Sequence, residues 1–289
     1  MTMFGNQNRR GGRGLNLRWI IAAVIAVGAI VSYMSKTTVN EVTGEKQRIG
    51  MSVEQEKAMG LAAAPDMASQ MGGVADPVRD RDAARVAQVG AKLVQRSDAA
   101  RSAYADNFHY YLLNDSKTIN AFALPGGQIF ITRALYNQLQ NEGQLAGVLG
   151  HETGHVVARH SAEQMAKGQL GQMLVTAVAV GASDDRGHGQ TAAMAAQMAN
   201  QMVRLHYGRD DETQADTLGL KYMAQAGYHP RGMAGVMNVL AEASKGNRQP
   251  EFLSSHPYPE HRQQVIEAYL KEHAAELQNA DLTDGPPLR

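Results

Sequence analysis

The chain contains no cysteine among its 289 residues. Disulfide bonds, thiolate metal ligands, a cysteine nucleophile and a lipidated amino-terminal cysteine are therefore all excluded. Any metal site must be built from histidine and carboxylate side chains, which is typical of catalytic rather than structural zinc. The lack of cysteine leaves the cellular compartment open.

The chain also lacks an excess of either charge, because 28 Lys and Arg residues balance 28 Asp and Glu residues. Nucleic-acid binding usually requires a strongly basic face, so this balance argues against a nucleic-acid partner. Aromatic residues make up only 6% of the chain, whereas 44% of the chain is hydrophobic and 15 residues are Met. This content is enough for one sizeable core with adaptable packing, and we find no internal repeat or second-domain linker.

Long apolar runs are scarce, and the clearest one covers residues 19–34. Residues 1–18 before it are Gly-rich and basic without any acid, which predicts a disordered segment on the cytoplasmic side. The run lacks a polar stripe and has Trp19 and Tyr33 at its edges, which favours a transmembrane anchor with the rest of the chain on the periplasmic side. A cleaved signal segment, which would release a secreted or periplasmic protein, is the alternative, although residues 31–35 make a poor cleavage site.

Helix-capping signals predict that the remainder is mostly helical. Ser52, Thr132 and Asn141 are suited to cap helices, and Asp76-Pro77 and Pro230 are typical of helix starts. Three short strands are expected over residues 108–113, 119–124 and 128–131, with a Pro-Gly-Gly turn between the last two. We therefore predict an α+β fold, mostly α-helical, with a small antiparallel β-sheet.

Two further helical segments, residues 169–182 and 191–205, are rich in small and apolar side chains and are joined by a charged loop. The first segment is too short to span a membrane comfortably. Together the two segments are expected to form a helical hairpin. Ordinary core packing explains this composition, and contact with a membrane or with unfolded substrate is the alternative.

The motif around which the chain is organised is His151-Glu152-Thr153-Gly154-His155, at the end of an apolar helical run. Residues four apart lie on one face of a helix, so His151 and His155 can reach one metal ion. Glu152 can contact a water molecule bound to that metal. Two imidazole ligands and a carboxylate general base form a zinc-hydrolase arrangement, and the apolar context argues against the alternative of a plain surface helix.

A third ligand is needed, since catalytic zinc usually has three protein ligands. His160 is five residues past His155 and falls off the ligand face, so we expect it to be structural or solvated. Glu212 lies downstream, on a predicted helix, with Asp216 four residues later on the same face. Glu212 can bind the metal while Asp216 accepts an N–H from a ligand histidine.

At this point the chain resembles the membrane-associated gluzincin zinc metalloproteases, which include the CAAX prenyl proteases, the HtpX-type heat-shock proteases and the BepA-type periplasmic proteases. The matching segments follow the order and spacing of that family over about residues 50–270. They are residues 120–127, 145–155, 212–216 with Gly219, and 255–257 with Arg262.

The resemblance implies a zincin-type domain that binds one Zn²⁺ through His151, His155 and Glu212, with Glu152 as the general base. His256 is expected close to the zinc, either stabilising the oxyanion or occupying the open metal position in a resting state.

The resemblance also implies a substrate-binding edge next to the metal site. Main-chain hydrogen bonds along a strand grip a peptide with little regard to its sequence. The residues expected to contact substrate are Asn120, Ala121, Phe122, Ala123 and Arg262.

We therefore expect a zinc metalloendopeptidase domain over residues 51–278, between a polar linker at 35–50 and a flexible tail at 279–289. Its expected substrates are proteins or peptides, unfolded or misassembled envelope proteins above all. One candidate membrane helix and no following helical-repeat region suggest a minimal, singly anchored member. A membrane-tethered chaperone with non-catalytic zinc and a zinc amidase acting on a non-protein or cell-wall substrate are the alternatives.

Overall fold

The computed structural model describes residues 17–182, 207–245, 249–257 and 259–288. The basic segment up to residue 16, the loop at 183–190 and the helix predicted over 191–205 lie outside these residues.

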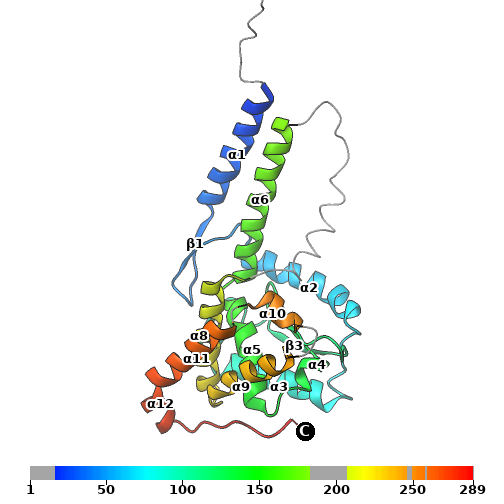
Figure 1. Cartoon of the computed structure of the whole chain (residues 1–289), viewed down its shortest axis with the longest axis vertical. Helices are drawn as coiled ribbons and strands as arrows, with labels where there is room; N and C mark the ends of the chain where they lie inside the picture. Colours follow the sequence, from blue (N-terminus) through cyan, green and yellow to red (C-terminus); the bar gives the residue numbers. More distant parts are fainter. Residues whose placement is uncertain (1–16, 183–206, 246–248, 258, 289) are drawn as a thin grey trace, which may run out of the picture.

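Two long helices lie side by side and project together from a helical body (Figure 1). They are α1 (Leu17–Ser35) and α6 (His160–Ala182). Both helices carry exposed apolar side chains, as the exposed fractions of 67% for Val24 and 60% for Val178 show. In the part of the chain that the structure describes, no helix combines the length and the apolar character needed to cross a membrane.

Residues between α1 and the body form a small hairpin of β1 (Thr37–Val39) and β2 (Lys46–Arg48), where a polar linker was expected. Two polar side chains of this hairpin reach the end of another helix. Asn40 Nδ2 donates to the Val157 carbonyl at 2.8 Å, and Gln47 Nε2 donates to the Ala158 carbonyl at 2.5 Å. The hairpin therefore satisfies carbonyl groups that a helix end leaves without partners.

The body begins with α2 (Val53–Gln70) and α3 (Arg81–Gln95), followed by the short 3-10 helix η1 (Asp98–Arg101). The predicted cap at Ser52 is confirmed, since its side chain and that of Gln55 form a reciprocal capping box. The predicted helix start at Asp76-Pro77 is wrong. Residues 77–79 form a turn, and Asp80 caps α3 by accepting two backbone N–H groups.

A three-stranded sheet packs beside these helices, with the strand order β3 (His109–Leu113), β5 (Gln128–Thr132) and β4 (Ala121–Leu124). The predicted hairpin of β4 and β5 is confirmed, but β3 runs parallel to β5, so the expectation of a wholly antiparallel sheet is wrong. Parallel strands need a connection of a dozen or more residues, and residues 114–127, which include β4, provide it. All residues of β5 are buried, as expected for a central strand.

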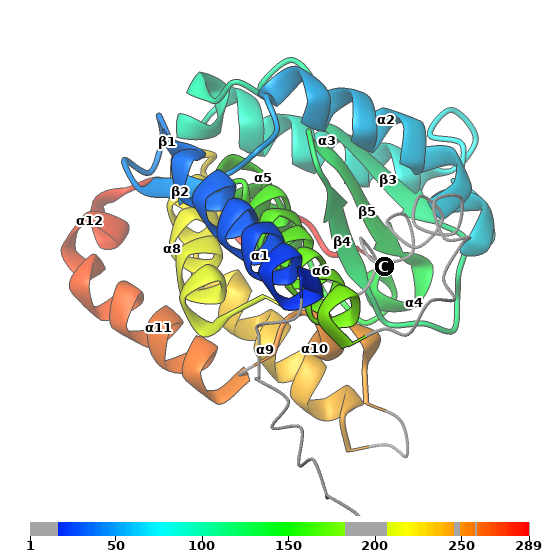
Figure 2. The same ribbon diagram turned by 90° about the horizontal axis from the view of Figure 1, so that it is seen from above.

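Helix α5 (Glu142–Val157) carries the HExxH motif through the centre of the body, after the short helix α4 (Arg133–Tyr136). Figure 2 shows α5 between the sheet and α8 (Arg209–Gln225). The two helices approach closely because glycines face the neighbouring backbone. A Cβ on Gly154 would lie only 2.8 Å from the Ala215 carbonyl oxygen. The spacing between α5 and α8 is therefore set by their backbones.

The remaining helices close the body. They are α9 (Arg231–Ala243), α10 (Glu251–Ser255), α11 (Pro259–Glu272) and α12 (Ala274–Asn279). The carboxyl-terminal segment, which we expected to be flexible, is held against α5. Gly143 N donates to the Asp284 carbonyl at 2.7 Å, Leu288 N donates to the Gln140 carbonyl at 3.0 Å, and the Leu288 side chain is buried.

Candidate metal centre

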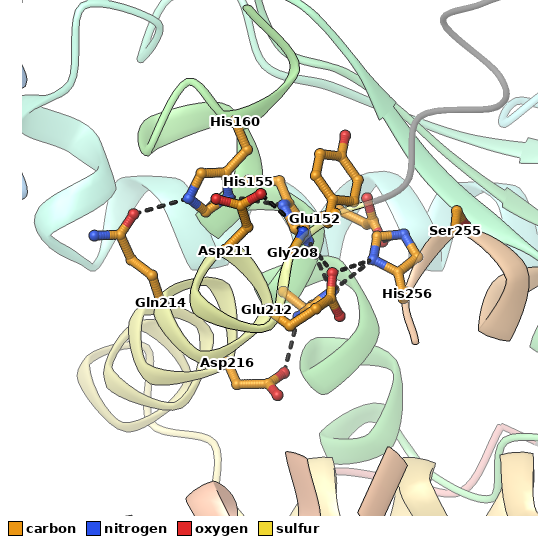
Figure 3. A network of polar contacts seen from close by, with 12 residues as sticks. Glu152, His155, His160, Gly208, Asp211, Glu212, Gln214, Asp216, Ser255 and His256 are labelled. Atoms are coloured by element: carbon orange, nitrogen blue, oxygen red, sulfur yellow. Dashed lines mark hydrogen bonds and ion pairs between the residues drawn. The ribbon is translucent and has the colours of Figure 1, made fainter. Parts of the chain in front are cut away.

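Four buried side chains from three elements converge in the middle of the body (Figure 3). His151 and His155 come from α5, Glu212 comes from α8, and His256 directly follows α10. Each offers one ligand atom, and these atoms all lie within 4.8 Å of one another. The structure thus brings together the three residues expected to bind metal and the histidine expected near them.

The donor atoms are spaced as the ligands of a single tetrahedral ion are. His151 Nε2 lies 3.0 Å from His155 Nε2 and 3.1 Å from His256 Nδ1. Glu212 Oε1 lies 3.3 Å from His155 Nε2 and 3.1 Å from His256 Nδ1. Ligands at about 2.0–2.1 Å from a tetrahedral Zn²⁺ lie about 3.3–3.4 Å apart. The residues present therefore fit a zinc ion in their spacing and in their chemistry.

Asp216 orients the first histidine. Its Oδ1 lies 2.9 Å from His151 Nδ1, so a proton on Nδ1 is donated to the carboxylate and Nε2 keeps its lone pair. Burial, with the neighbouring charges of Arg262 and His155, lowers the pKa of His151 to about 3. The imidazole is therefore neutral at pH 7, which is the form that binds metal.

Arg262 lies behind this pair rather than in contact with bulk solvent. Its Nε and Nη2 donate to both oxygens of Asp216 at 2.8 and 2.7 Å, and Nη1 lies 3.2 Å from Glu212 Oε2. The residue is buried, so the expectation that it contacts substrate is not supported by its position. Its position instead suits it to hold Asp216 and Glu212 in their ionised forms.

His160 contacts His155, a contact that the spacing of the two residues along an uninterrupted helix did not predict. His160 Nδ1 lies 2.8 Å from His155 Nδ1, and His160 Nε2 lies 2.8 Å from Gln214 Oε1 (Figure 3). Helix α5 ends at Val157. The helical backbone breaks at Arg159, whose φ of +59° lies in the left-handed region, and α6 begins at His160.

The lone pairs and the negative charge of the clustered donor atoms favour a bound cation. The Nε2 atoms of His151 and His155 face each other at 3.0 Å while their Nδ1 atoms face other partners. Burial opposes ionisation of Glu212, but His256 and Arg262 outweigh burial and hold its pKa well below the ordinary value. Converging lone pairs and a buried carboxylate are the donor set that a divalent metal ion prefers.

Glu152 lies beside the cluster, with its Oε1 3.4 Å from His256 Nε2. Its Oε1 is buried without a hydrogen-bond partner, and the Ala123 backbone N–H acts to lower the pKa of the carboxyl group. Burial is the largest cause that raises the pKa of Glu152, to about 7. A carboxyl group with this pKa can both accept and donate a proton near neutral pH.

Strand β4 lies next to Glu152 and forms one edge of the described sheet, since it pairs only with β5. Of the residues expected to bind substrate, Asn120, Ala121 and Ala123 are buried and Phe122 is partly exposed. The Oδ1 atom of Asn120 has no hydrogen-bond partner among the described residues. The structure therefore places the expected strand edge beside Glu152, and the Asn120 Oδ1 atom near this edge lacks a hydrogen-bond partner among the described residues.

Buried metal donors, a buried carboxylate beside them and a strand edge that is unpaired within the described sheet together define a metallohydrolase centre. Comparison with known sequences identifies the family to which this centre belongs. The profile of peptidase family M48 matches residues 80–270. The chain therefore belongs to peptidase family M48, which confirms the resemblance inferred from its motifs.

Individual relatives agree with this assignment. The chain is 31% identical over 224 residues to the beta-barrel assembly-enhancing protease of Yersinia pestis, with 73% of this chain and 43% of that protein covered. It is 30% identical over 272 residues to the mitochondrial metalloendopeptidase OMA1 of Schizosaccharomyces pombe, with 93% of this chain and 77% of that protein covered. The chain thus spans less than half the length of the beta-barrel assembly-enhancing proteases that it matches.

Proposed function

We propose that this chain is a zinc-dependent endopeptidase in which His151, His155 and Glu212 bind the metal. The observation that carries the proposal is the buried donor cluster beside Glu152, whose Oε1 has no hydrogen-bond partner. Zn²⁺, when bound, would acidify a water molecule and polarise the scissile carbonyl.

Glu152 would move the protons in this reaction. It would accept a proton from the attacking water and later donate that proton to the nitrogen of the leaving amine. The Ala123 N–H would stabilise the ionised carboxylate, and Asp216 with Arg262 would hold His151 in place.

Strand β4 would grip the substrate backbone, since its outer edge is not paired within the described sheet. Asn120, whose buried Oδ1 has no partner, would accept a hydrogen bond from the peptide at one end of this edge. Ala121, Phe122 and Ala123 would line the remainder. Recognition through the main chain suits a protease with broad substrates such as unfolded or misassembled envelope proteins.

His256 would act as a plug rather than as a permanent ligand. Its Nδ1 occupies the fourth donor position, and its Nε2 lies 3.4 Å from Glu152 Oε1. Catalytic zinc sites keep one position open for water, whereas sites closed by four side chains are structural. This geometry favours a resting state over the oxyanion-stabilising role that the sequence also allowed, and His256 would have to withdraw before water enters.

We further propose that α1 and α6 attach the protein to a membrane, with the catalytic body on the extracytoplasmic side. No charged residue occurs from Trp19 to Ser35 or from Gly168 to Ala182. The two helices lie side by side, and exposed apolar side chains of both, such as Val24, Val27, Val175 and Val178, project together from the body. At the base, Arg48 lies 5.6 Å from the Tyr33 ring, which suits the level of lipid headgroups.

Binding of the full chain to phospholipid vesicles tests this attachment. The double variant Val24→Asp with Val178→Asp places a charge on each exposed face and should release most of the bound protein. An equal bound fraction for the variant and the unmodified protein would refute the role of this surface.

The endopeptidase proposal is tested by cleavage of an unfolded model protein with the full chain and two variants. Glu152→Gln keeps the shape of the side chain but removes the base, so activity should fall by about 10²–10⁴-fold while zinc content is unchanged. Glu212→Ala removes a ligand and should lose both zinc and activity. Cleavage by Glu152→Gln at the unmodified rate, or full zinc occupancy in Glu212→Ala, would refute these roles.

Cleavage by none of the three proteins would favour the tethered chaperone with non-catalytic zinc. Failure on protein substrates, with hydrolysis of a cell-wall peptide, would favour the amidase.

A further inference from the structure

We propose that His160 and Gln214 are positioning residues that fix the proton on His155 Nδ1 and so leave Nε2 free to bind the metal. The inference rests on the proposed role of His155 as a zinc ligand. It assigns a role to a histidine that motif spacing excluded from the metal site.

The order of protons follows from hydrogen-bond chemistry. Gln214 Oε1 can only accept, so His160 Nε2 must carry the proton across their 2.8 Å contact. A neutral imidazole has one N–H, so His160 Nδ1 is then an acceptor. It accepts from His155 Nδ1 across 2.8 Å, which leaves His155 Nε2 with a lone pair.

The opposite placement of the protons on the two histidine rings would prevent His155 from binding a metal ion. If the Gln214 amide presented its NH₂ group, His160 Nε2 would accept and His160 Nδ1 would donate. His155 Nδ1 would then be the acceptor, and the proton of His155 would lie on Nε2, which points at His151 Nε2 and Glu212 Oε1. A protonated Nε2 cannot bind a metal ion.

Several interactions elsewhere in the fold bring His160 to this position. On an uninterrupted helix, side chains five residues apart point about 140° away from each other. The break at Arg159 removes this separation. Buried Glu56 accepts from Arg159 Nε at 3.0 Å and from the Tyr104 hydroxyl at 2.8 Å, which holds the break in place.

The two ligand histidines of α5 are therefore oriented by different chemistry. His151 donates to a carboxylate that Arg262 neutralises, whereas His155 donates to the neutral His160 imidazole, which in turn donates to an amide oxygen. The second arrangement depends entirely on which end of one amide group faces His160. Gln214 is only partly buried, so this dependence can be tested without emptying the core.

The test measures zinc affinity, by competition with a chelator, for variants of the full chain. Gln214→Met removes the acceptor at similar length, Gln214→Lys supplies only donors, and His160→Phe keeps a ring without nitrogen. Each should weaken zinc binding by about 10–100-fold, the usual cost of losing a partner of a ligand histidine. Gln214→Glu is the conservative variant, and because its carboxylate still accepts, it should retain the affinity.

A matched control is available on the same helix. Gln225 also lies on α8 and accepts one hydrogen bond, from the Asp98 N–H at 2.9 Å, away from the metal donors. Gln225→Met should leave zinc affinity unchanged. Thermal unfolding of every variant identifies any loss of affinity that only follows a loss of fold.

A direct readout of the proton is nitrogen-15 NMR of the histidine rings in the zinc-free protein. The His155 proton should be on Nδ1 in the unmodified chain and on Nε2 in Gln214→Lys. Unchanged zinc affinity in both Gln214→Met and His160→Phe, or an equal loss in Gln214→Glu and Gln214→Met, would overturn the proposal. If the unmodified chain binds no zinc, the proposed zinc endopeptidase function has failed. This result differs from the results that would overturn only the positioning role of His160 and Gln214.

Discussion

Replacing Glu56 by Ala tests the buried ion pair at the break between α5 and α6. Glu56 is only 2% exposed, and its carboxylate binds the Arg159 guanidinium and the Tyr104 hydroxyl. The variant leaves the guanidinium without its charged partner and the hydroxyl without an acceptor. Removing one partner of a buried pair costs about 3–5 kcal/mol. The free energy of unfolding should fall by that amount.

The neighbouring residue provides the control. Lys57 pairs with Asp106 at 2.7 Å, but the Asp106 side chain is 80% exposed. Exposed pairs contribute about 0–1 kcal/mol, so Asp106→Ala should change stability very little. Urea denaturation followed by circular dichroism, with the slope of the transition compared between variants, measures both effects.

A second substitution tests the cause of the loss. Adding Arg159→Gly to Glu56→Ala removes the stranded charge and places glycine at a φ of +59°, where a side chain costs about 1–2 kcal/mol. The double variant should therefore be more stable than Glu56→Ala alone. A loss for Glu56→Ala as small as that for Asp106→Ala, or a double variant less stable than the single one, would refute the reasoning.

Two further predictions concern the site itself. His256→Ala should raise the initial rate of cleavage if this residue plugs the site, because the fourth donor position opens to water; a rate lowered at unchanged zinc content would instead support an oxyanion role. The raised pKa of Glu152 predicts a pH-dependent stability of the zinc-free protein. Because burial favours the protonated carboxyl, its stabilising contribution is complete below pH 4.5 and is lost as pH rises through about 7. Relative to the unmodified protein, the free energy of unfolding of Glu152→Gln should therefore rise by about 3 kcal/mol between pH 4.5 and 7. A difference in the free energy of unfolding that is independent of pH across that window would contradict the prediction.

Much of the site could be predicted because it obeys local periodicity. His151 and His155 share a helix face by their spacing, and the same rule placed Asp216 one turn from Glu212. Helix caps at Ser52, Thr132 and Asn141 were equally local, since each cap side chain accepts from a backbone N–H three residues later.

The remainder depends on contacts that no local pattern encodes. His160 reaches His155 only because one residue adopts a left-handed backbone, and a distant carboxylate on α2 stabilises that conformation. Arg262 matched a sequence motif, yet its role follows from burial against Asp216 rather than from its position in the chain. The parallel pairing of β3 with β5 likewise follows from how the chain returns, not from strand composition.

The break at Arg159 also gives the molecule a mechanical property. His160 is the first residue of α6, a helix of 23 residues that leaves the body and ends beside α1. Such a helix is about 35 Å long, and its near end lies at the break. The imidazole at that end is one hydrogen bond away from His155. A displacement of the projecting helix at its base would therefore act first on the residue that contacts His155.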